Sequence, residues 1–371
     1  MKKETISDIQ GISLLILFIY GSTLVMGTGG NAKNDIWIAI MLAIAVSIPT
    51  VLMYARILGR YPGKDLYDIL CEVFGNYAGK LFILFFIWFS FHLGALVLRN
   101  FGEFLVTVGL PETPKIVPII IFALVCVIGV KCGIETLARC STFFVLFVFF
   151  LLIMLSSFAI PIMKPENLLP ILKNGLTPVW QGAFAAFTFP FGETVVFLMV
   201  FDSLSSSKTI HRVYLKALII SGMFIAFVSA RNIMILGSET AGAVYFPSYS
   251  VISRVNIGNF LQRLEISVTI VFIIAGFIKI CICLLAASKG VTKLFGFKDY
   301  RYFVTPVALL MVNLSYLLYD SIMEMFEWAE EIYPYYALPF QVILPLIILI
   351  AIEIKSRLQK KEVKTEDKAQ V

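Results

Sequence analysis

The sequence predicts an all-α polytopic membrane protein with ten transmembrane helices, arranged as a 5+5 inverted repeat in which helices 1 and 6 are broken. The 371 residues are 59% hydrophobic and only 15% charged, and their mean hydropathy is +0.91. Soluble domains carry about a quarter charged residues, so this composition excludes a soluble globule. Apolar runs of about 20 residues recur along the chain, which is the length that crosses a bilayer as a helix.

The apolar segments define one membrane domain and a short polar tail. We predict spans at residues 9–27, 35–58, 78–108, 114–131, 141–163, 178–201, 213–236, 264–288, 303–323 and 335–355. The membrane domain is therefore residues 1–355, and residues 356–371 are predicted to form a disordered cytoplasmic tail. The longest external loop, 237–263, contains a predicted short amphipathic helix at 248–255.

Basic residues give an independent test of this topology. Lys and Arg concentrate in alternate loops, and this bias places both termini in the cytoplasm. The last external loop, residues 324–331, contains four acids and no base. The net charge of +6 therefore reports the topology, and the dispersed bases do not form a nucleic-acid site.

The first and sixth spans are each interrupted by glycine or proline near their middle. The interruptions are Tyr20-Gly21-Ser22-Thr23 and Phe189-Pro190-Phe191-Gly192-Glu193. Backbone that leaves a helix inside a membrane is tolerated only where protein buries it or where it lines a wet cavity. Because the two breaks lie five spans apart, in the first span of each set of five, they predict an inverted repeat with a solute site between the broken helices.

The chemistry of a broken helix suits a zwitterion. The N-terminus of a half-helix carries a partial positive charge that attracts a carboxylate, and freed carbonyl groups attract an ammonium group or a cation. We therefore expect the residues of the two breaks to bind a small solute such as an amino acid. Packing of small residues alone is the other interpretation of Gly21.

Three charged residues are candidates for ion coupling or ion pairing. Glu193 lies near the centre of its span, where a carboxylate costs about 3 kcal/mol, so it is expected to be paired, neutral or in contact with water. Lys279 is mid-span, where it either pairs with Glu193 or takes the place of a coupling cation. Arg99 precedes Glu103 by one helical turn and is expected to form a structural pair with it.

The remaining polar and aromatic residues predict structural roles. Arg231 is expected to extend to the membrane interface, and His92 to be a core histidine with satisfied hydrogen bonds. Six cysteines and two histidines show no metal-binding spacing, so we expect no metal and no cofactor. No nucleophile and base are paired, so we expect no enzyme activity. The predicted interfacial anchors are Trp88, Trp180, Trp328, Tyr333, Tyr335 and Tyr336.

An ordered set of short segments resembles the endospore germination permeases, the B subunits of nutrient germinant receptors in the amino acid/polyamine/organocation transporter superfamily. The segments are 6–10 (ISDIQ), 34–37 (NDIW), 189–193 (FPFGE), 263–265 (RLE), 277–279 (FIK) and 298–301 (KDYR). The resemblance covers nearly the whole chain. One departure is Gly21-Ser22-Thr23, where amino acid transporters of that superfamily commonly have Gly-x-Gly.

The resemblance implies a nutrient sensor in the inner membrane of a dormant spore. It implies a germinant site at Gly21 to Thr23 and at Phe189 to Glu193, and partners in the form of a membrane A subunit and a lipid-anchored C subunit. Two functions follow as hypotheses. The first is a receptor subunit that binds a germinant at mid-membrane and triggers germination, and the second is an amino acid transporter coupled to protons or sodium.

Overall fold

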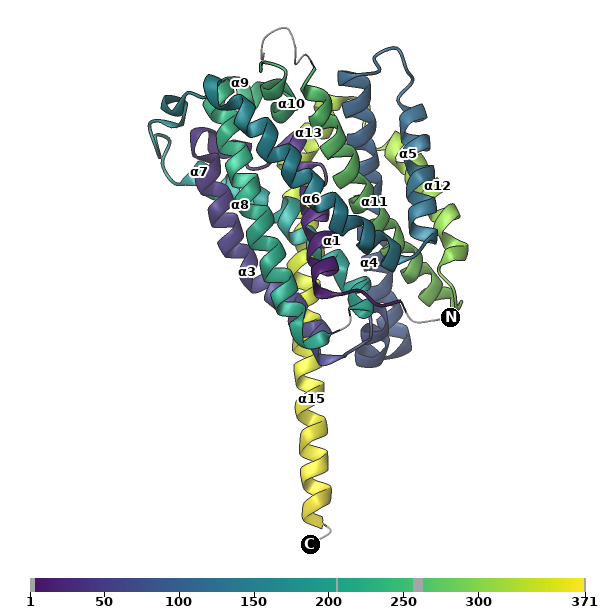
Figure 1. The fold of residues 1–371 in the computed structure, drawn as a ribbon. Coiled ribbons are helices and arrows are strands. Elements are labelled where there is room, and N and C mark those ends of the chain that lie inside the picture. Colours follow the sequence, from purple (N-terminus) through teal and green to yellow (C-terminus); the bar gives the residue numbers. More distant parts are fainter. Residues whose placement is uncertain (1–3, 205, 256–262, 370–371) are drawn as a thin grey trace.

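The protein is a bundle of helices, seen from the side in Figure 1. The computed structural model describes residues 4–204, 206–255 and 263–369. The only β pairing in those ranges is an isolated parallel bridge between Ile6 and Leu204. The main α-helices are α1 (Asp8–Tyr20), α2 (Thr23–Met26), α3 (Ile36–Arg60), α4 (Leu66–Val108), α5 (Ile116–Lys131), α6 (Ile134–Ala159), α7 (Thr177–Ala186), α8 (Ile210–Leu236), α9 (Ser238–Ala243), α10 (Pro247–Ile252), α11 (Glu265–Phe295), α12 (Arg301–Leu317), α13 (Ile322–Glu327), α14 (Tyr333–Leu338) and α15 (Leu344–Ala369).

Shorter 3₁₀ and π segments connect several of these helices. The segment η1 (Gly30–Asp35) leads into α3, and η4 (Phe187–Phe191) and η5 (Gly192–Met199) continue α7. The segments η8 (Trp328–Ile332) and η9 (Pro339–Ile343) join α13, α14 and α15 into one helical unit. Shorter 3₁₀ turns of three or four residues are η2 (Ile160–Ile162), η3 (Pro165–Leu168), η6 (Phe201–Ser203) and η7 (Ser207–Thr209).

The helices coincide with the predicted spans. Within the described ranges, eight helical units are long and apolar enough to cross a membrane, and α5 and α12 are shorter apolar helices of 16 and 17 residues. Each of the ten predicted segments overlaps one of these units. The all-α, multi-pass class is thus confirmed, while the inverted relation of the two sets of five stays a prediction.

The two broken spans are the most deeply enclosed. In the units Asp8–Met26 and Thr177–Met199, 83% of an apolar stretch of 18 residues is buried. The corresponding share in Ile322–Leu358 is 28%. Helix α1 packs against α6, α8 and α11, while α3 packs on α8 and α11 on α4. Because neighbouring helices cover both broken spans, their irregular backbone does not face lipid.

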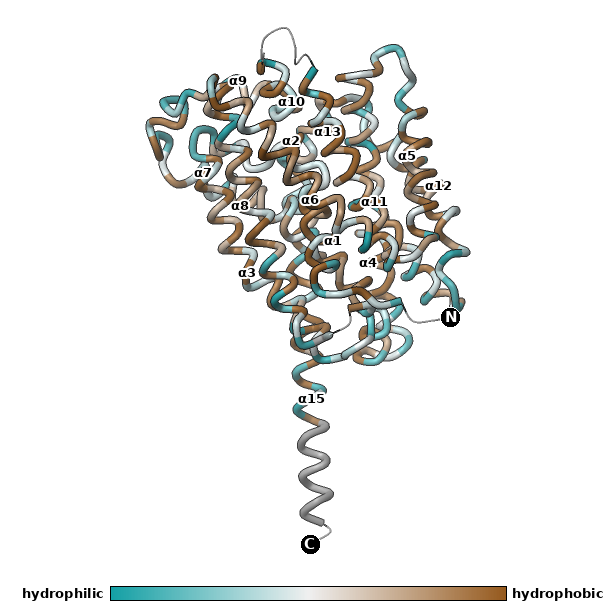
Figure 2. Tube along the Cα trace, in the orientation of Figure 1, coloured by the Kyte–Doolittle hydropathy of each residue, from teal (hydrophilic) through white to brown (hydrophobic). Residues whose placement is uncertain are grey.

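The hydropathy of the residues changes along the axis of the bundle. Apolar residues cover its middle and polar residues gather at its ends, as Figure 2 shows. Helix α1 begins and α15 ends at the same end of the bundle, as an even number of spans requires (Figure 1). The predicted loop helix is present as α10.

The predicted disorder of the tail is wrong for the residues that the structure describes. Helix α15 continues from the membrane domain through Ala369, and residues 370 and 371 lie outside the described ranges. The tail is rich in Lys, Glu and Gln, all of which have high helix propensity. A preceding apolar helix also removes the cost of nucleation, so the polar segment extends it.

Candidate functional site

The first span breaks where the sequence predicts. Helix α1 ends at Tyr20, α2 begins at Thr23, and Gly21 between them has φ 27° and ψ −115°. A Cβ atom at Gly21 would lie 2.4 Å from Cδ of Lys279, which is closer than any real contact. Glycine is therefore required here both by the backbone angle and by the approach of the lysine.

The sixth span breaks at Phe189, whose φ of −133° and ψ of 105° are not helical. Two side chains satisfy carbonyl groups that the break releases. Gln341 Nε2 donates to Thr188 O at 2.8 Å, and Thr28 Oγ1 donates to Phe189 O at 2.7 Å. The Tyr54 hydroxyl donates to Gln341 O at 2.5 Å and lies 3.3 Å from Gly192 O. The freed carbonyl groups are thus paired by side chains from other parts of the chain, as buried backbone requires.

A buried ion pair lies between the two breaks. Lys279 Nζ on α11 is 2.5 Å from Glu193 Oε2, and the side chains are 0% and 1% exposed. The Tyr333 hydroxyl donates to the other carboxylate oxygen of Glu193 at 2.5 Å. The ammonium of Lys279 also faces the rings of Phe189 and Phe18, at 5.0 and 5.3 Å from their centroids. Of the two expectations for Lys279, the structure shows the pairing.

A small inner cavity adjoins this pair. Its volume is about 50 Å³. The polar residues that line it include Glu193, Asn100 and Tyr333. Met26, Phe189 and Trp328 contribute apolar and aromatic surface. Ligand sites usually measure about 300–1,000 Å³, so in this conformation the inner cavity holds a few water molecules at most.

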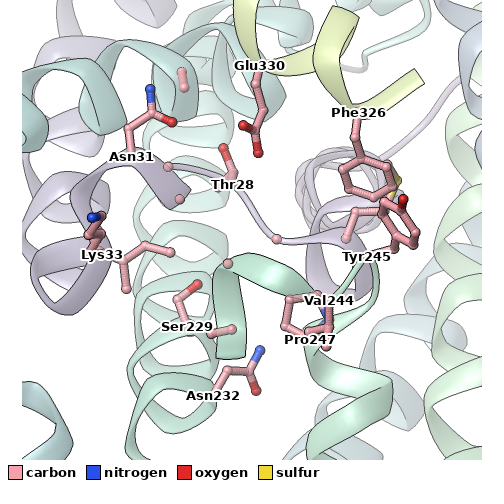
Figure 3. Close-up of a pocket in the computed structure, with 18 of the residues that line it drawn as sticks. Thr28, Asn31, Lys33, Ser229, Asn232, Val244, Tyr245, Pro247, Phe326 and Glu330 are labelled. Atoms are coloured by element: carbon pink, nitrogen blue, oxygen red, sulfur yellow. The ribbon is translucent and has the colours of Figure 1, made fainter. Parts of the chain in front are cut away.

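A larger cavity opens toward the end of the bundle opposite α15, and we call it the vestibule. Its volume is about 270 Å³, and it is lined by Thr28 and Asn31 beside the first break and by Ser229, Asn232, Tyr245 and Glu330 (Figure 3). Met26, Phe189 and Ala329 line both the vestibule and the inner cavity. We call these three residues, which line both cavities, the shared wall.

The structure places the predicted binding residues in different surroundings. Phe189 and Glu193 line the inner cavity, and Ser22 Oγ accepts a hydrogen bond from the cavity residue Asn100 at 3.4 Å. Gly192 instead faces Gln341 Oε1. Tyr20 packs its ring against Phe149, with 6.0 Å between centroids. Within the described ranges, the buried hydroxyls of Tyr20 and Thr23 have no hydrogen-bond partner. Pro190 is buried in the break.

Arg99 is part of a structural network at the end of α12. It pairs with Glu103 at 2.9 Å, as predicted, and Glu103 also pairs with Lys115. The Arg99 guanidinium donates to the carbonyl oxygens of Ser315, Tyr316 and Tyr319. Ser315 and Tyr316 lie in the last turn of α12, where carbonyl groups lack a partner from the next turn, and Tyr319 follows shortly after the helix ends, so Arg99 caps α12.

Two structural predictions need correction. Arg231 does not extend to the interface, because it is 2% exposed and donates to Asn232 Oδ1 and to Ser156 Oγ. His92 is a core residue stacked on Trp88, but its Nδ1 atom has no partner among the described residues. Both side chains are held by neighbouring helices, which hydropathy along a single span does not reveal.

The sequence interpretation missed three residues of the site. Tyr333 is 4% exposed and binds Glu193, so its prediction as an interfacial anchor is wrong. Asn100 and Gln341 are buried polar residues inside apolar spans. The criterion that selected Glu193, a polar group in a span, was enough to find these two. Trp88 and Trp180 are 45% and 55% exposed, and their role as interfacial anchors stays a prediction.

Comparison with known sequences gives a consistent result. The sequence model of a family described as "Spore germination protein" matches residues 5–322. Spore germination protein KB of Bacillus subtilis (strain 168) is 31% identical over 368 residues, which are 97% of this chain and 98% of that protein. Spore germination protein XB of Bacillus anthracis is 24% identical over 260 residues, which are 67% of this chain and 70% of that protein.

Two solved structures illustrate the fold that this chain shares. MhsT in complex with L-phenylalanine superimposes with a TM-score of 0.71 at 12% identity, covering 94% of this chain and 89% of that chain. Mhp1, a nucleobase-cation-symport-1 family transporter in a closed conformation, gives a TM-score of 0.61 at 11% identity, covering 94% of this chain and 78% of that chain. At these identities the likeness shows the fold alone, and that fold is the transporter fold expected from the sequence.

Proposed function

Because this chain belongs to the spore germination protein family, we propose that it is a receptor subunit that binds a small nutrient germinant, an amino acid, at the broken helices and thereby triggers germination. The family model spans most of the chain, and the alignment with protein KB covers nearly all of it. The chain is a multi-pass membrane protein of a germination receptor and permease family with the fold of transporters, and it is not an enzyme.

The observation that carries this proposal is the buried pair of Glu193 and Lys279 at the meeting point of both breaks. Opposite charges side by side complement the two ends of a zwitterion. An entering amino acid exchanges the internal pair for two new pairs, its ammonium with Glu193 and its carboxylate with Lys279. A buried charge must keep a partner, and this exchange leaves both Glu193 and Lys279 with one.

Binding at this position requires a change of conformation. The inner cavity of about 50 Å³ is too small for an amino acid, whereas the vestibule beyond the shared wall measures about 270 Å³. Displacement of Phe189 and Met26 joins the two cavities. Because Phe189 is also the point where the sixth span breaks, its movement transmits ligand binding to η4 and η5.

The partners and location belong to the same proposal. We place the chain in the spore inner membrane with both termini in the cytoplasm, supported by the distribution of Lys and Arg among its loops. We also assign it a larger membrane A subunit and a lipoprotein C subunit as partners, which rests on the resemblance of its sequence segments to receptor B subunits.

A working amino acid carrier coupled to protons or sodium is the second candidate, favoured by the fold that the chain shares with Mhp1, a transporter. In that case Glu193 or Lys279 changes its charge or its partner in each transport cycle. The candidates differ in one observable. A carrier accumulates solute in vesicles with an ion gradient, and a sensor without transport does not.

Germination assays test the proposal directly. Spores that lack the gene are compared with complemented spores across single amino acids, sugars and purines. The proposal expects loss of the response to one nutrient, restored by the wild-type gene but not by Gly192 or Glu193 variants that still accumulate. Normal responses to every nutrient, in a strain without a related receptor, contradict it and leave uptake in vesicles as the test of the carrier.

Phe189→Ala is expected to join the two cavities. Removing the ring opens the shared wall, so a cysteine introduced at Asn100 becomes accessible to an impermeant thiol reagent added on the vestibule side. We expect labelling to be faster by about tenfold, a change in access equivalent to about 1.4 kcal/mol. Phe187→Ala is the matched control, because Phe187 is a buried neighbour in η4 outside the shared wall. Equal rates in both variants contradict this role of Phe189.

A further inference from the structure

We propose that the vestibule is itself a binding site, separate from the inner cavity, that takes the ammonium group of a small organic cation or zwitterion. Its volume of about 270 Å³ suits a molecule of amino acid size. Binding in the vestibule rests on its own residues and is tested independently of the germinant site between the broken helices, whereas its role in entry rests on the proposed function.

Ser229 presents an unused hydroxyl to the vestibule. The residue is 7% exposed and lies on the wall of the cavity, where Figure 3 shows it beneath Thr28 and Glu330. No hydrogen bond of its side chain is found in the described ranges, although serines within helices usually donate to the preceding turn. Six other helical serines of the described ranges donate to the carbonyl four residues earlier, for example Ser221, which donates to Ala217 O at 2.6 Å. A buried hydroxyl without a protein partner is free to bind a ligand.

The charge of the lining favours a cation. Glu327, Glu330 and Lys33 are the charged residues of the vestibule, so acids outnumber bases. No ion pair of either glutamate is found among the described residues. Both belong to the external loop that contains four acids and no base, so the field at the mouth attracts positive ligands.

Aromatic and apolar groups select an organic ammonium over a bare metal ion. The rings of Tyr245 and Phe326 lie 5.0 Å apart at the mouth of the vestibule, and both line it. Aromatic faces stabilise ammonium groups through cation–π attraction. Ile36 and Ile233 add apolar surface for the carbon chain. A hard divalent cation instead needs six or more oxygen ligands, and this lining does not supply them.

The position of the vestibule gives it a role in the entry of a ligand to the inner cavity. Phe189, Met26 and Ala329 form its floor and are the same residues that close the inner cavity. A ligand held by its ammonium group at Glu330 therefore waits directly beyond the shared wall. The vestibule concentrates cationic and zwitterionic solutes there before the wall opens.

The test uses protection of a cysteine at Ala241, which lines the vestibule from α9 and bears no polar group of the site. The full-length chain with Ala241→Cys is expressed in intact cells and labelled with an anionic, impermeant methanethiosulfonate reagent, and the parent chain gives the background. Butylammonium, butyrate and potassium chloride are compared at equal ionic strength. At about twice its Kd, butylammonium leaves about one third of the sites free and slows labelling about threefold.

Two variants separate binding from general electrostatics. Glu330→Gln in the Ala241→Cys chain is expected to abolish protection by butylammonium. Glu331→Gln, which removes the same charge from the neighbouring exposed position outside the vestibule lining, is expected to keep it. Equal protection by potassium chloride or by butyrate overturns the proposal, and so does full protection in Glu330→Gln.

Discussion

Replacing Lys279 with methionine is expected to abolish accumulation of the folded protein. The change leaves Glu193 as a carboxylate that is 1% exposed, with the Tyr333 hydroxyl as its remaining hydrogen-bond donor. Breaking a buried ion pair by removing one partner costs about 3–5 kcal/mol, which is a large part of the stability of a typical protein. The measurement is the amount of the chain in spore membranes and its thermal stability in detergent.

A double variant separates the structural role of the pair from its role in sensing. Glu193→Gln combined with Lys279→Met leaves no buried charge, so accumulation is expected to recover substantially. The germinant response is expected to remain absent, because both proposed ligand-binding charges are gone. Recovery of a normal response in the double variant contradicts the exchange of ion pairs proposed for germinant binding.

Lys293→Met is the matched control on the same helix. Lys293 forms an ion pair with Asp68, but both side chains are about 40% exposed. Exposed pairs contribute about 0–1 kcal/mol, so this variant is expected to accumulate and respond normally. If Lys279→Met accumulates as well as Lys293→Met, the buried pair does not stabilise the membrane domain.

The second large effect is expected from Gly21→Ala. Its φ of 27° is strained for any residue with a side chain, and the added Cβ would lie 2.4 Å from Cδ of Lys279. The lysine must move away, which breaks its short contact with Glu193. We expect a loss of at least about 1–2 kcal/mol from the backbone alone and loss of the germinant response.

Gly192→Ala tests the other break by a different contact. Its Cβ would lie 2.2 Å from Gln341 Oε1, and Gln341 also holds the freed carbonyl of Thr188. Overpacking of this kind costs about 1–3 kcal/mol. Gly276→Ala on α11 is the control for both variants, since the nearest atoms to its Cβ belong to Phe122 at 3.9 Å. Normal germination by both break variants contradicts a functional role for the unwound segments.

Much of the fold is predictable from local sequence. Long apolar runs specify the spans, because bilayer thickness acts on each run independently of its neighbours. Although α3 and α12 continue through Pro49 and Pro306, glycine or proline within a run indicates a possible break. This is why Gly21 and Phe189 were placed correctly at the breaks. The polar tail is the exception, since helix propensity and continuity with α15 outweigh its polarity.

The site was harder to predict because its residues meet only through tertiary packing. Nothing within the last span distinguishes Tyr333, which binds Glu193, from the exposed Tyr335 two residues later. The pairing of Lys279 with Glu193 likewise depends on how α11 approaches η5. Burial of Arg231 results from Ser156 and Asn232, one of which lies on another helix.

Changing the size of the inner cavity tests the central claim most directly. Leu96 on α4 lines the inner cavity, and Leu98 on the same helix is buried outside its lining. In spores that accumulate each variant, half-maximal concentrations are measured for the natural germinant and for an analogue with a larger side chain. The account predicts that Leu96→Ala shifts their ratio toward the larger analogue by at least about tenfold, while Leu98→Ala leaves it unchanged. An unchanged ratio in Leu96→Ala spores contradicts germinant binding between the broken helices.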